Sequence, residues 1–424
     1  PVAKGQFIAL SGNTGASKGP HIHLEMHKTK SNNLCDPLNF LKSFIKDKTA
    51  PAVYSFKSYP QPGEGVFQHS PDSRIFTFDK GRFQAWGKVG FGIRANDHMD
   101  SVYNNYGVRY TRLYCDGKLV FASDVNNIPV SCNRMVNSWG DYDHFLHTKI
   151  WFMKSFIEPG NTLPILRAGA DRGIINFNQQ RDYHLRYVVS DAFGNQTVKE
   201  FTVHGEPQAI PSVAKPEGGV PLYCKKDNRI NADGVRLNIQ KGLLAKDGWL
   251  LMRTVPMGNA LSMGYSFSKA PYPLFNYAEI NIKAKDGIRN PEKLYIAARN
   301  NAAGGGPSAY CGGIYTNGWV KGRFRELSDI YFLTSDETAP LITKMNLDPR
   351  HLFFKITDSG SGLKAYQASV DGEFILLEFG KNKEVFFCDL TETPVQRTGK
   401  ERTLKVSAVD NRDNRREFVT KIKY

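Results

Sequence analysis

The stretch LRYVVSD at residues 185–191 has a close counterpart in LKVSAVD at residues 404–410. In both, apolar and polar side chains alternate and β-branched residues are frequent, which is typical of a half-buried β-strand. The first stretch leads to a turn signal at Gly194 and Asn195, the second to one at Asp413 and Asn414, and a further apolar run follows each. A strand, a tight turn and a final strand are therefore predicted at both places.

Two further landmarks occur in the same order before these strands. The sequence DKTAP at residues 47–51 is echoed by DETAP at residues 336–340, and each proline introduces a new apolar alternation. Asp-Gly pairs at residues 116–117 and 371–372 stand between strand-forming residues, which is a strong signal for a β-hairpin. Three matched landmarks predict two copies of one β-sandwich plan.

The landmarks also predict the domain boundaries. The second copy, residues 338–424, is near the ~100 residues of an immunoglobulin-like sandwich. The first copy spans residues 48–205 and is longer, so it must carry an insertion. Residues 206–337 open with a proline-rich linker and contain strand-like runs, so they are predicted to form another β module. Residues 1–47 form a separate N-terminal part. The predicted fold class is mostly β, with tandem β-sandwich modules.

The composition limits the class of protein. The 424-residue chain is 41% hydrophobic and 23% charged, which is typical of a soluble globular protein. No stretch approaches the roughly 20 apolar residues of a membrane span, so no transmembrane segment is predicted. The net charge of +15 favours polyanions. Because Lys and Arg are dispersed and no zinc-finger, RRM or helix-turn-helix pattern occurs, we expect no nucleic-acid partner.

Residues 5–27 carry the chemical signal. They read GQFIAL, SGNTGASKGP and HIHLEMH, which predicts a strand, a glycine-rich loop and a second strand. In the second strand the period of two separates an apolar face from a polar face that holds His21, His23, Glu25 and His27. Two imidazoles two residues apart lie about 7 Å from each other on such a face. One can then bind a metal while the other contacts the water or the substrate.

The whole string GQFIALSGNTGASKGPHIHLE resembles the C-terminal signature of the lysostaphin-type (LytM-like) zinc metallopeptidases. The resemblance covers about the first 45 residues and ends with the run DPLNFL at residues 36–41. It implies that residues 1–47 are the C-terminal part of a peptidase domain with a partial β-sheet. It further implies that His23 is a Zn²⁺ ligand, that His21 is the catalytic histidine, and that Glu25 is a supporting carboxylate near the metal.

The family's other two zinc ligands are a His and an Asp from an upstream His-x-x-x-Asp motif, and residues 1–20 contain neither. We therefore expect the chain to start within the domain and to be catalytically silent by itself. For the complete domain, the resemblance implies zinc-assisted hydrolysis of peptide bonds in peptidoglycan. The modules after residue 47 resemble, more loosely, those of exported peptidases from Bacteroidetes-like bacteria, which implies the periplasm or the outer cell envelope.

Two alternatives stay open at this stage. The protein could be a catalytically inactive LytM-like regulator of a partner amidase, or an envelope scaffold or binding protein; retention of both His21 and His23 favours the peptidase.

A rival cluster, DYDHFLH at residues 141–147, contains four potential metal ligands. Trp139 and Trp151 flank it, so we assign it to the edge of the inserted part of the first sandwich and give it no metal. The oligomeric state is not predicted.

Overall fold

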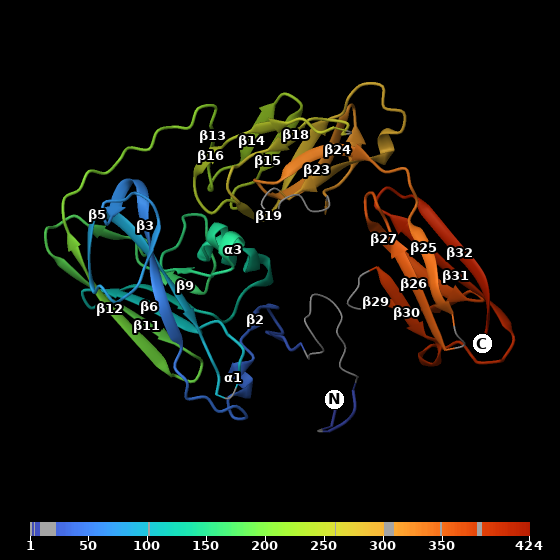
Figure 1. Ribbon diagram of the computed structural model, residues 1–424, viewed down its shortest axis with the longest axis horizontal. Helices are drawn as coiled ribbons and strands as arrows, with labels where there is room; N and C mark the ends of the chain where they lie inside the picture. Colours follow the sequence, from blue (N-terminus) through green and yellow to red (C-terminus); the bar gives the residue numbers. More distant parts are fainter. Residues whose placement is uncertain are drawn as a thin grey trace.

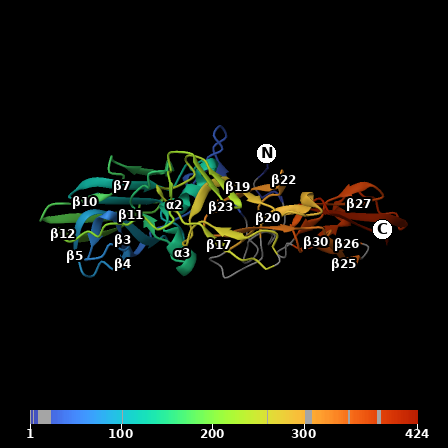
Figure 2. The same cartoon turned by 90° about the horizontal axis from the view of Figure 1, so that it is seen from above.

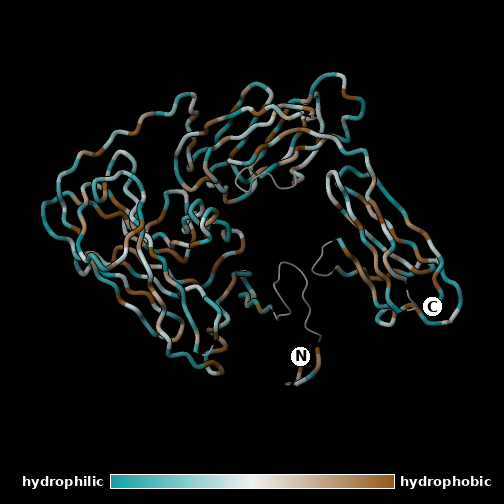
Figure 3. The backbone as a smooth tube through the Cα atoms, in the orientation of Figure 1, coloured by the Kyte–Doolittle hydropathy of each residue, from teal (hydrophilic) through white to brown (hydrophobic). Residues whose placement is uncertain are grey.

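The computed structural model describes residues 2–3, 5–8, 23–100, 102–258, 260–300, 309–347, 350–379 and 384–424. Nearly all regular structure is β-strand, as the sequence predicts. Three β modules follow one another along an arch, with the middle module at its top (Figure 1). Seen from above, the same modules lie in a row (Figure 2). Apolar and polar residues alternate along the strands of each module (Figure 3), as expected for sheets with one face in a core.

A short segment precedes the first module. It consists of a two-stranded hairpin and one turn of helix: β1 (Met26–His27), β2 (Leu34–Cys35) and α1 (Leu38–Leu41). Met26 pairs with Cys35 in the hairpin. Leu34 also forms a β-bridge with Ile128, so this segment is attached to the first module by its backbone.

The first module is built around two long antiparallel strands, β3 (Ala52–Phe67) and β5 (Arg82–Asn96). Its ten-stranded sheet has the order β4-β3-β5-β12-β11-β6-β7-β9, and β8 and β10 both pair with β5. The other strands are β4 (Arg74–Phe76), β6 (Tyr110–Cys115), β7 (Lys118–Asp124), β8 (Met153–Lys154), β9 (Leu166–Ala168), β10 (Ile175–Phe177), β11 (Asp182–Ser190) and β12 (Gln196–Gly205). The predicted insertion contains the 3₁₀ helix η1 (Val130–Met135), α2 (Val136–Trp139) and α3 (Tyr142–Thr148).

An aromatic cluster fills the core of the first module. Phe56 of β3 stacks on Phe201 of β12 with ring centroids 4.4 Å apart, and Phe67 meets Phe91 edge to face at 5.6 Å. All four rings are buried. Such aromatic pairs contribute about 0.5–1.5 kcal/mol each beyond the burial of their area. The packing of β3 on β12 holds the long sheet curled around one core.

The middle module is a sandwich of two five-stranded sheets. Their orders are β14-β15-β19-β23-β22 and β17-β18-β24-β20-β21, and β13 pairs separately with β16. The elements are β13 (Val220–Leu222), β14 (Asn228–Ala232), β15 (Val235–Ile239), β16 (Gly248–Leu250), β17 (Arg253–Val255), β18 (Gly264–Ser266), β19 (Pro273–Lys283), η2 (Pro291–Lys293), β20 (Leu294–Arg299), β21 (Ala309–Tyr310), β22 (Ile314–Thr316), β23 (Trp319–Glu326) and β24 (Ile330–Ser335).

The last module is a compact sandwich of two four-stranded sheets, ordered β25-β26-β30-β29 and β28-β27-β31-β32. Its elements are β25 (Leu341–Leu347), β26 (His351–Thr357), β27 (Leu363–Val370), β28 (Glu373–Ile375), β29 (Glu378–Phe379), β30 (Val385–Asp389), η3 (Leu390–Glu392), β31 (Glu401–Asp410) and β32 (Arg415–Lys423). One buried cluster that includes Phe354, Leu404 and Val406 forms its core.

Both predicted Asp-Gly hairpins are confirmed. Asp116 and Gly117 join β6 to β7, and Asp371 and Gly372 join β27 to β28. All four residues have positive φ, between 48° and 87°. Two consecutive positive φ values give the backbone the twist that matches antiparallel strands, and Asp followed by Gly tolerates them best.

Across the described residues, no helix combines the length and the apolar character that crossing a bilayer requires.

Candidate functional site

His23, Glu25 and His27 lie side by side on the exposed N-terminal segment. One oxygen of Glu25, Oε1, lies 2.9 Å from Nε2 of His23, and the other, Oε2, lies 2.9 Å from Nε2 of His27. The predicted sharing of one face by these three residues is therefore confirmed, although the regular strand starts only at Met26. Leu24, expected on an apolar packing face, is 51% exposed. His21 lies outside the described residues.

Glu25 couples the two imidazoles electrostatically. Hydrogen bonds from His27 and then from His23 hold the pKa of Glu25 below its ordinary value. The hydrogen bond to Glu25 raises the pKa of His27, and the backbone carbonyl of Asn32 adds to this effect. Glu25 therefore stays a carboxylate at neutral pH, and as an acceptor it favours the tautomer of His23 that carries its proton on Nε2.

The donor atoms around His23 fit one position of a zinc site. With the proton on Nε2, the lone pair of Nδ1 is available to a metal, and Nδ1 has no partner among the described residues. A carboxylate behind a histidine ligand is a usual feature of such sites, since it fixes the tautomer and increases basicity. Neither of the two groups of three potential metal ligands among the described residues includes His23. The described residues thus place one imidazole, with a carboxylate hydrogen-bonded behind it, at this position.

The segment that carries His23 is fastened to the first module by charge. Arg109 is 7% exposed, and its Nη1 donates to Asp36 at 2.6 Å while its Nε donates to Asp124 at 2.6 Å. Asn126 adds a hydrogen bond from the backbone N–H of Asp36 to its side-chain oxygen. Arg109 was not predicted as a site residue, and the sequence gives no signal for its contact with Asp36, which lies 73 positions away along the chain.

Residues 141–147, the rival cluster, lie within the insertion of the first module, where they form the N-cap and nearly all of α3. Asp141 caps this helix by accepting from the backbone N–H of His144. Its Oδ2 accepts from Nζ of Lys57 at 2.6 Å and from the hydroxyl of Tyr59 at 2.9 Å. The ring of His144 packs edge to face on Phe152 at 5.3 Å. These contacts give the cluster a structural role in joining the insertion to β3.

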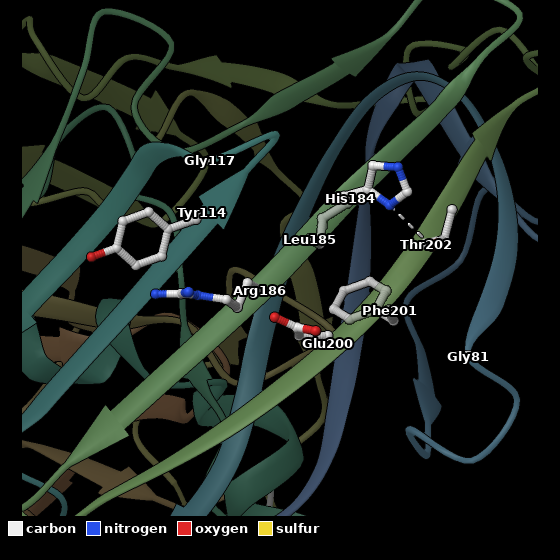
Figure 4. A pocket seen from close by; sticks show the side chains of 9 residues that line it. All are labelled: Gly81, Tyr114, Gly117, His184, Leu185, Arg186, Glu200, Phe201 and Thr202. Atoms are coloured by element: carbon white, nitrogen blue, oxygen red, sulfur yellow. Dashed lines mark hydrogen bonds between the residues drawn. The ribbon is translucent and has the colours of Figure 1, made fainter.

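An open cavity of about 480 Å³ lies on the outer face of β6, β11 and β12 (Figure 4). Arg186 lies between its cross-strand neighbours Tyr114 and Glu200, with its guanidinium 5.1 Å from the Tyr114 ring. In the next row, His184 and Thr202 are 3.5 Å apart. A ladder of this kind stabilises a solvated sheet face, and we assign no chemistry to it.

Two groups of three aspartates occupy corresponding places in the first and last modules. The first group is Asp47, Asp97 and Asp191, and the second is Asp336, Asp358 and Asp410. Four of these six residues stand in the sequence echoes at residues 47–51, 185–191, 336–340 and 404–410. The sequence echoes predicted the two modules but not the aspartate groups, because nothing in the sequence indicates that Asp97 or Asp358 lies next to the other aspartates.

Comparisons with known proteins characterise the middle module. Residues 220–336 match the family model of a Zu5-like domain. None of the curated proteins matches the chain.

The similarity to three solved structures is weak. A bacterial ice-binding adhesin of 1.5 MDa is 9% identical over 86% of this chain and 98% of its own, with a TM-score of 0.14. The protein PcdhgB3 EC1-4 is 12% identical over 94% of this chain and 88% of its own, with a TM-score of 0.16. A Ca²⁺-stabilised adhesin of an Antarctic bacterium is 8% identical over 88% of this chain and 90% of its own, with a TM-score of 0.13. Scores this low carry no argument about function.

Proposed function

We propose that the segment around His23 belongs to a zinc-dependent endopeptidase domain and that the protein cuts peptide bonds in peptidoglycan. The observation that supports this most is the hydrogen bond between Glu25 and Nε2 of His23, because it leaves Nδ1 available as a metal ligand. The resemblance of residues 5–25 to the lysostaphin-type signature supplies the class of enzyme.

Each residue has a distinct role in this proposal. His23 binds the zinc ion, Glu25 orients His23, and His21 polarises the reacting groups at the scissile bond. Zinc bound there would supply Lewis acidity and a nucleophile at neutral pH. No histidine in the sequence is followed by Asp four residues later. The proposal therefore requires a His and an Asp from a preceding segment of the complete gene product.

The proposed substrate also fixes the compartment. Peptidoglycan lies outside the cytoplasmic membrane, so the protein is proposed to be exported to the periplasm or the outer cell envelope. Its net charge of +15 favours association with the anionic polymers of that environment. The β modules would then hold the peptidase segment near the wall.

The test is the zinc content of the complete gene product, measured by mass spectrometry after stripping and reloading. His23→Ala should lose stoichiometric zinc. His21→Ala should keep the metal and lose turnover, since a group beside the reacting atoms affects the transition state more than metal binding. His184→Ala, on the exposed face of β11, is the control and should keep both. Zinc retained at the wild-type level in His23→Ala contradicts the assignment.

A second function, a non-cutting regulator or envelope scaffold, has one observation in its favour. Among the described residues, neither group of three potential metal ligands includes His23. If the complete gene product binds no zinc, the peptidase proposal fails and the scaffold is favoured.

A further inference from the structure

Three buried aspartates converge where the N-terminal segment enters the first module. Asp47 precedes β3, Asp97 directly follows β5, and Asp191 directly follows β11. Each can offer a carboxylate oxygen within 4.8 Å of those of the other two. Their exposed fractions are 8%, 4% and 1%. Three carboxylates this close, and this far from water, repel one another strongly unless something positive lies between them.

The hydrogen bonds leave two oxygens without partners. Oδ1 of Asp191 accepts from three consecutive backbone N–H groups, those of residues 193–195, and its Oδ2 accepts from the amide of Asn195. Oδ1 of Asp47 accepts from the N–H of Thr49. Oδ2 of Asp47 and Oδ1 of Asp97 are shut off from solvent and have no hydrogen-bond partner among the described residues.

In the described part of the chain, this charge has no ion-pair partner. Across the described ranges, none of the three aspartates forms an ion pair with Lys, Arg or His. Burial, with the nearby charges of Asp191 and Asp47, raises the pKa of Asp97 to about 6. Burial also raises the pKa of Asp47, and the charge of Asp191 adds to the effect. At neutral pH the group therefore carries negative charge, and the described residues supply no ion-pair partner for it.

We propose that Asp47, Asp97 and Asp191 form a calcium site that fastens the N-terminal segment to the first module. Three carboxylates without imidazole or thiolate are ligands for a hard cation rather than for zinc. Calcium accepts six to eight oxygens in irregular geometry and tolerates backbone carbonyls, whereas magnesium demands a near-ideal octahedron. Loop-borne aspartates from three different places suit the less demanding ion.

A cavity beside the three aspartates gives an ion access to the site, and nearby hydrogen bonds indicate what a bound ion would stabilise. A cavity of about 490 Å³ between the N-terminal segment and the first module is lined by Asp97 and by Ala192, the neighbour of Asp191. The same loops already hold the entering chain: Asn195 donates to the carbonyl of Asp47 at 3.2 Å, and Thr197 donates to that of Pro51 at 2.6 Å. A bound ion would add a further connection and stiffen the link between His23 and the module.

The last module provides an internal comparison. Asp336, Asp358 and Asp410 cluster in the same way, but there Oδ2 of Asp336 accepts from the N–H of Ser361 at 2.7 Å. Oδ2 of Asp358 accepts from the N–H groups of Gly360 and Gly362. Within the described part of this group, no buried carboxylate oxygen is without a partner. Backbone donors thus partly fill the role that we assign to calcium, and the inference is confined to the first group.

The test uses the whole chain, stripped with EDTA and titrated with CaCl₂ by calorimetry and by thermal unfolding. We expect a site with a Kd on the order of 10⁻⁴ M, as in extracellular calcium modules, and a rise in Tm on the order of 5 °C at saturation. Asp97→Asn keeps the shape and removes one charge. It should weaken calcium binding at least about tenfold and abolish the rise in Tm, while unfolding without calcium stays cooperative.

Asp358→Asn is the matched control and should keep the calcium response of the wild type. Asp47→Asn is a second variant of the site and should behave like Asp97→Asn. An absence of calcium binding, or binding that both Asp97→Asn and Asp47→Asn leave intact, overturns the proposal. An equal response to MgCl₂ at the same concentration overturns the choice of ion. None of these readouts depends on zinc or on peptidase activity.

Discussion

Asp36 and Arg109 form an ion pair of 2.6 Å across 73 positions of the sequence, and this pair joins the segment that carries His23 to the first β module. Arg109 is almost fully buried and binds Asp124 at the same time. A charge held in this way has little access to water, so its partners determine whether the junction is stable.

Replacing Arg109 by Met should destabilise the first module by about 3 kcal/mol, because it leaves Asp36 and Asp124 without their counter-ion. The measurement is urea unfolding of the whole chain followed by tryptophan fluorescence. Arg82→Met is the control: its pair with Asp182 is exposed, so the loss should stay below about 1 kcal/mol. Equal losses in the two variants would show that the buried pair has no special role.

Glu25→Gln should weaken zinc binding by about 10- to 100-fold, because Gln cannot hold the Nε2 proton of His23 as a carboxylate does. The complete gene product is titrated with zinc against a chromophoric chelator. Glu64→Gln, which breaks only an exposed pair with Lys88, should leave the affinity unchanged. Wild-type affinity in Glu25→Gln would mean that Glu25 does not support the metal ligand.

The pair of Asp141 and Lys57 should make stability depend on pH below about 4. Burial opposes the charge of Asp141, but the hydrogen bond and the charge of Lys57 outweigh it and hold the pKa of Asp141 below its ordinary value. A depressed pKa adds stability above the unfolded value of about 3.9, and this stability disappears as the pH falls through the folded value. Asp141→Asn should cost about 3 kcal/mol at pH 7 and much less at pH 2. Thermal unfolding of both proteins from pH 7 to pH 2 measures this, and a constant difference would refute it.

The last module should fold alone, provided that Asp336 is included. Burial by itself raises the pKa of Asp336, but the N–H of Ser361 and that of Thr338 hold it below its ordinary value, so the carboxylate is bound favourably. A fragment of residues 334–424 should unfold cooperatively in calorimetry. Residues 338–424 should be less stable by about 2 kcal/mol, since a buried N–H then loses its acceptor. Equal stability of the two fragments would place the boundary after Asp336.

Local signals in the sequence predicted local structure well. The Asp-Gly pairs at residues 116–117 and 371–372 predicted hairpins because the turn type depends on the two residues themselves. The alternation in residues 185–191 and 404–410 predicted strands because one side of each strand faces a core. His23 and Glu25 were placed on one face because side chains two residues apart in a strand point to the same side.

The junctions could not be predicted, because they depend on residues that are distant in the sequence. Asp97 and Asp358 follow strands with no motif around them, and only the fold brings them beside Asp47 and Asp336. Arg109 likewise has no local signal for its pairs with Asp36 and Asp124. Leu24 lies on the predicted apolar face and is 51% exposed, because the strand period assigns a residue to a face but does not determine which surface covers that face.

The most direct test of the proposed function is digestion of purified peptidoglycan by the complete gene product with zinc, with soluble peptides separated by chromatography and identified by mass spectrometry. The proposal predicts new amino termini from cut stem or cross-bridge peptides with the wild type and with His184→Ala, and none with His21→Ala or His23→Ala. Release of the same peptides by His23→Ala, or none by the zinc-loaded wild type, contradicts it.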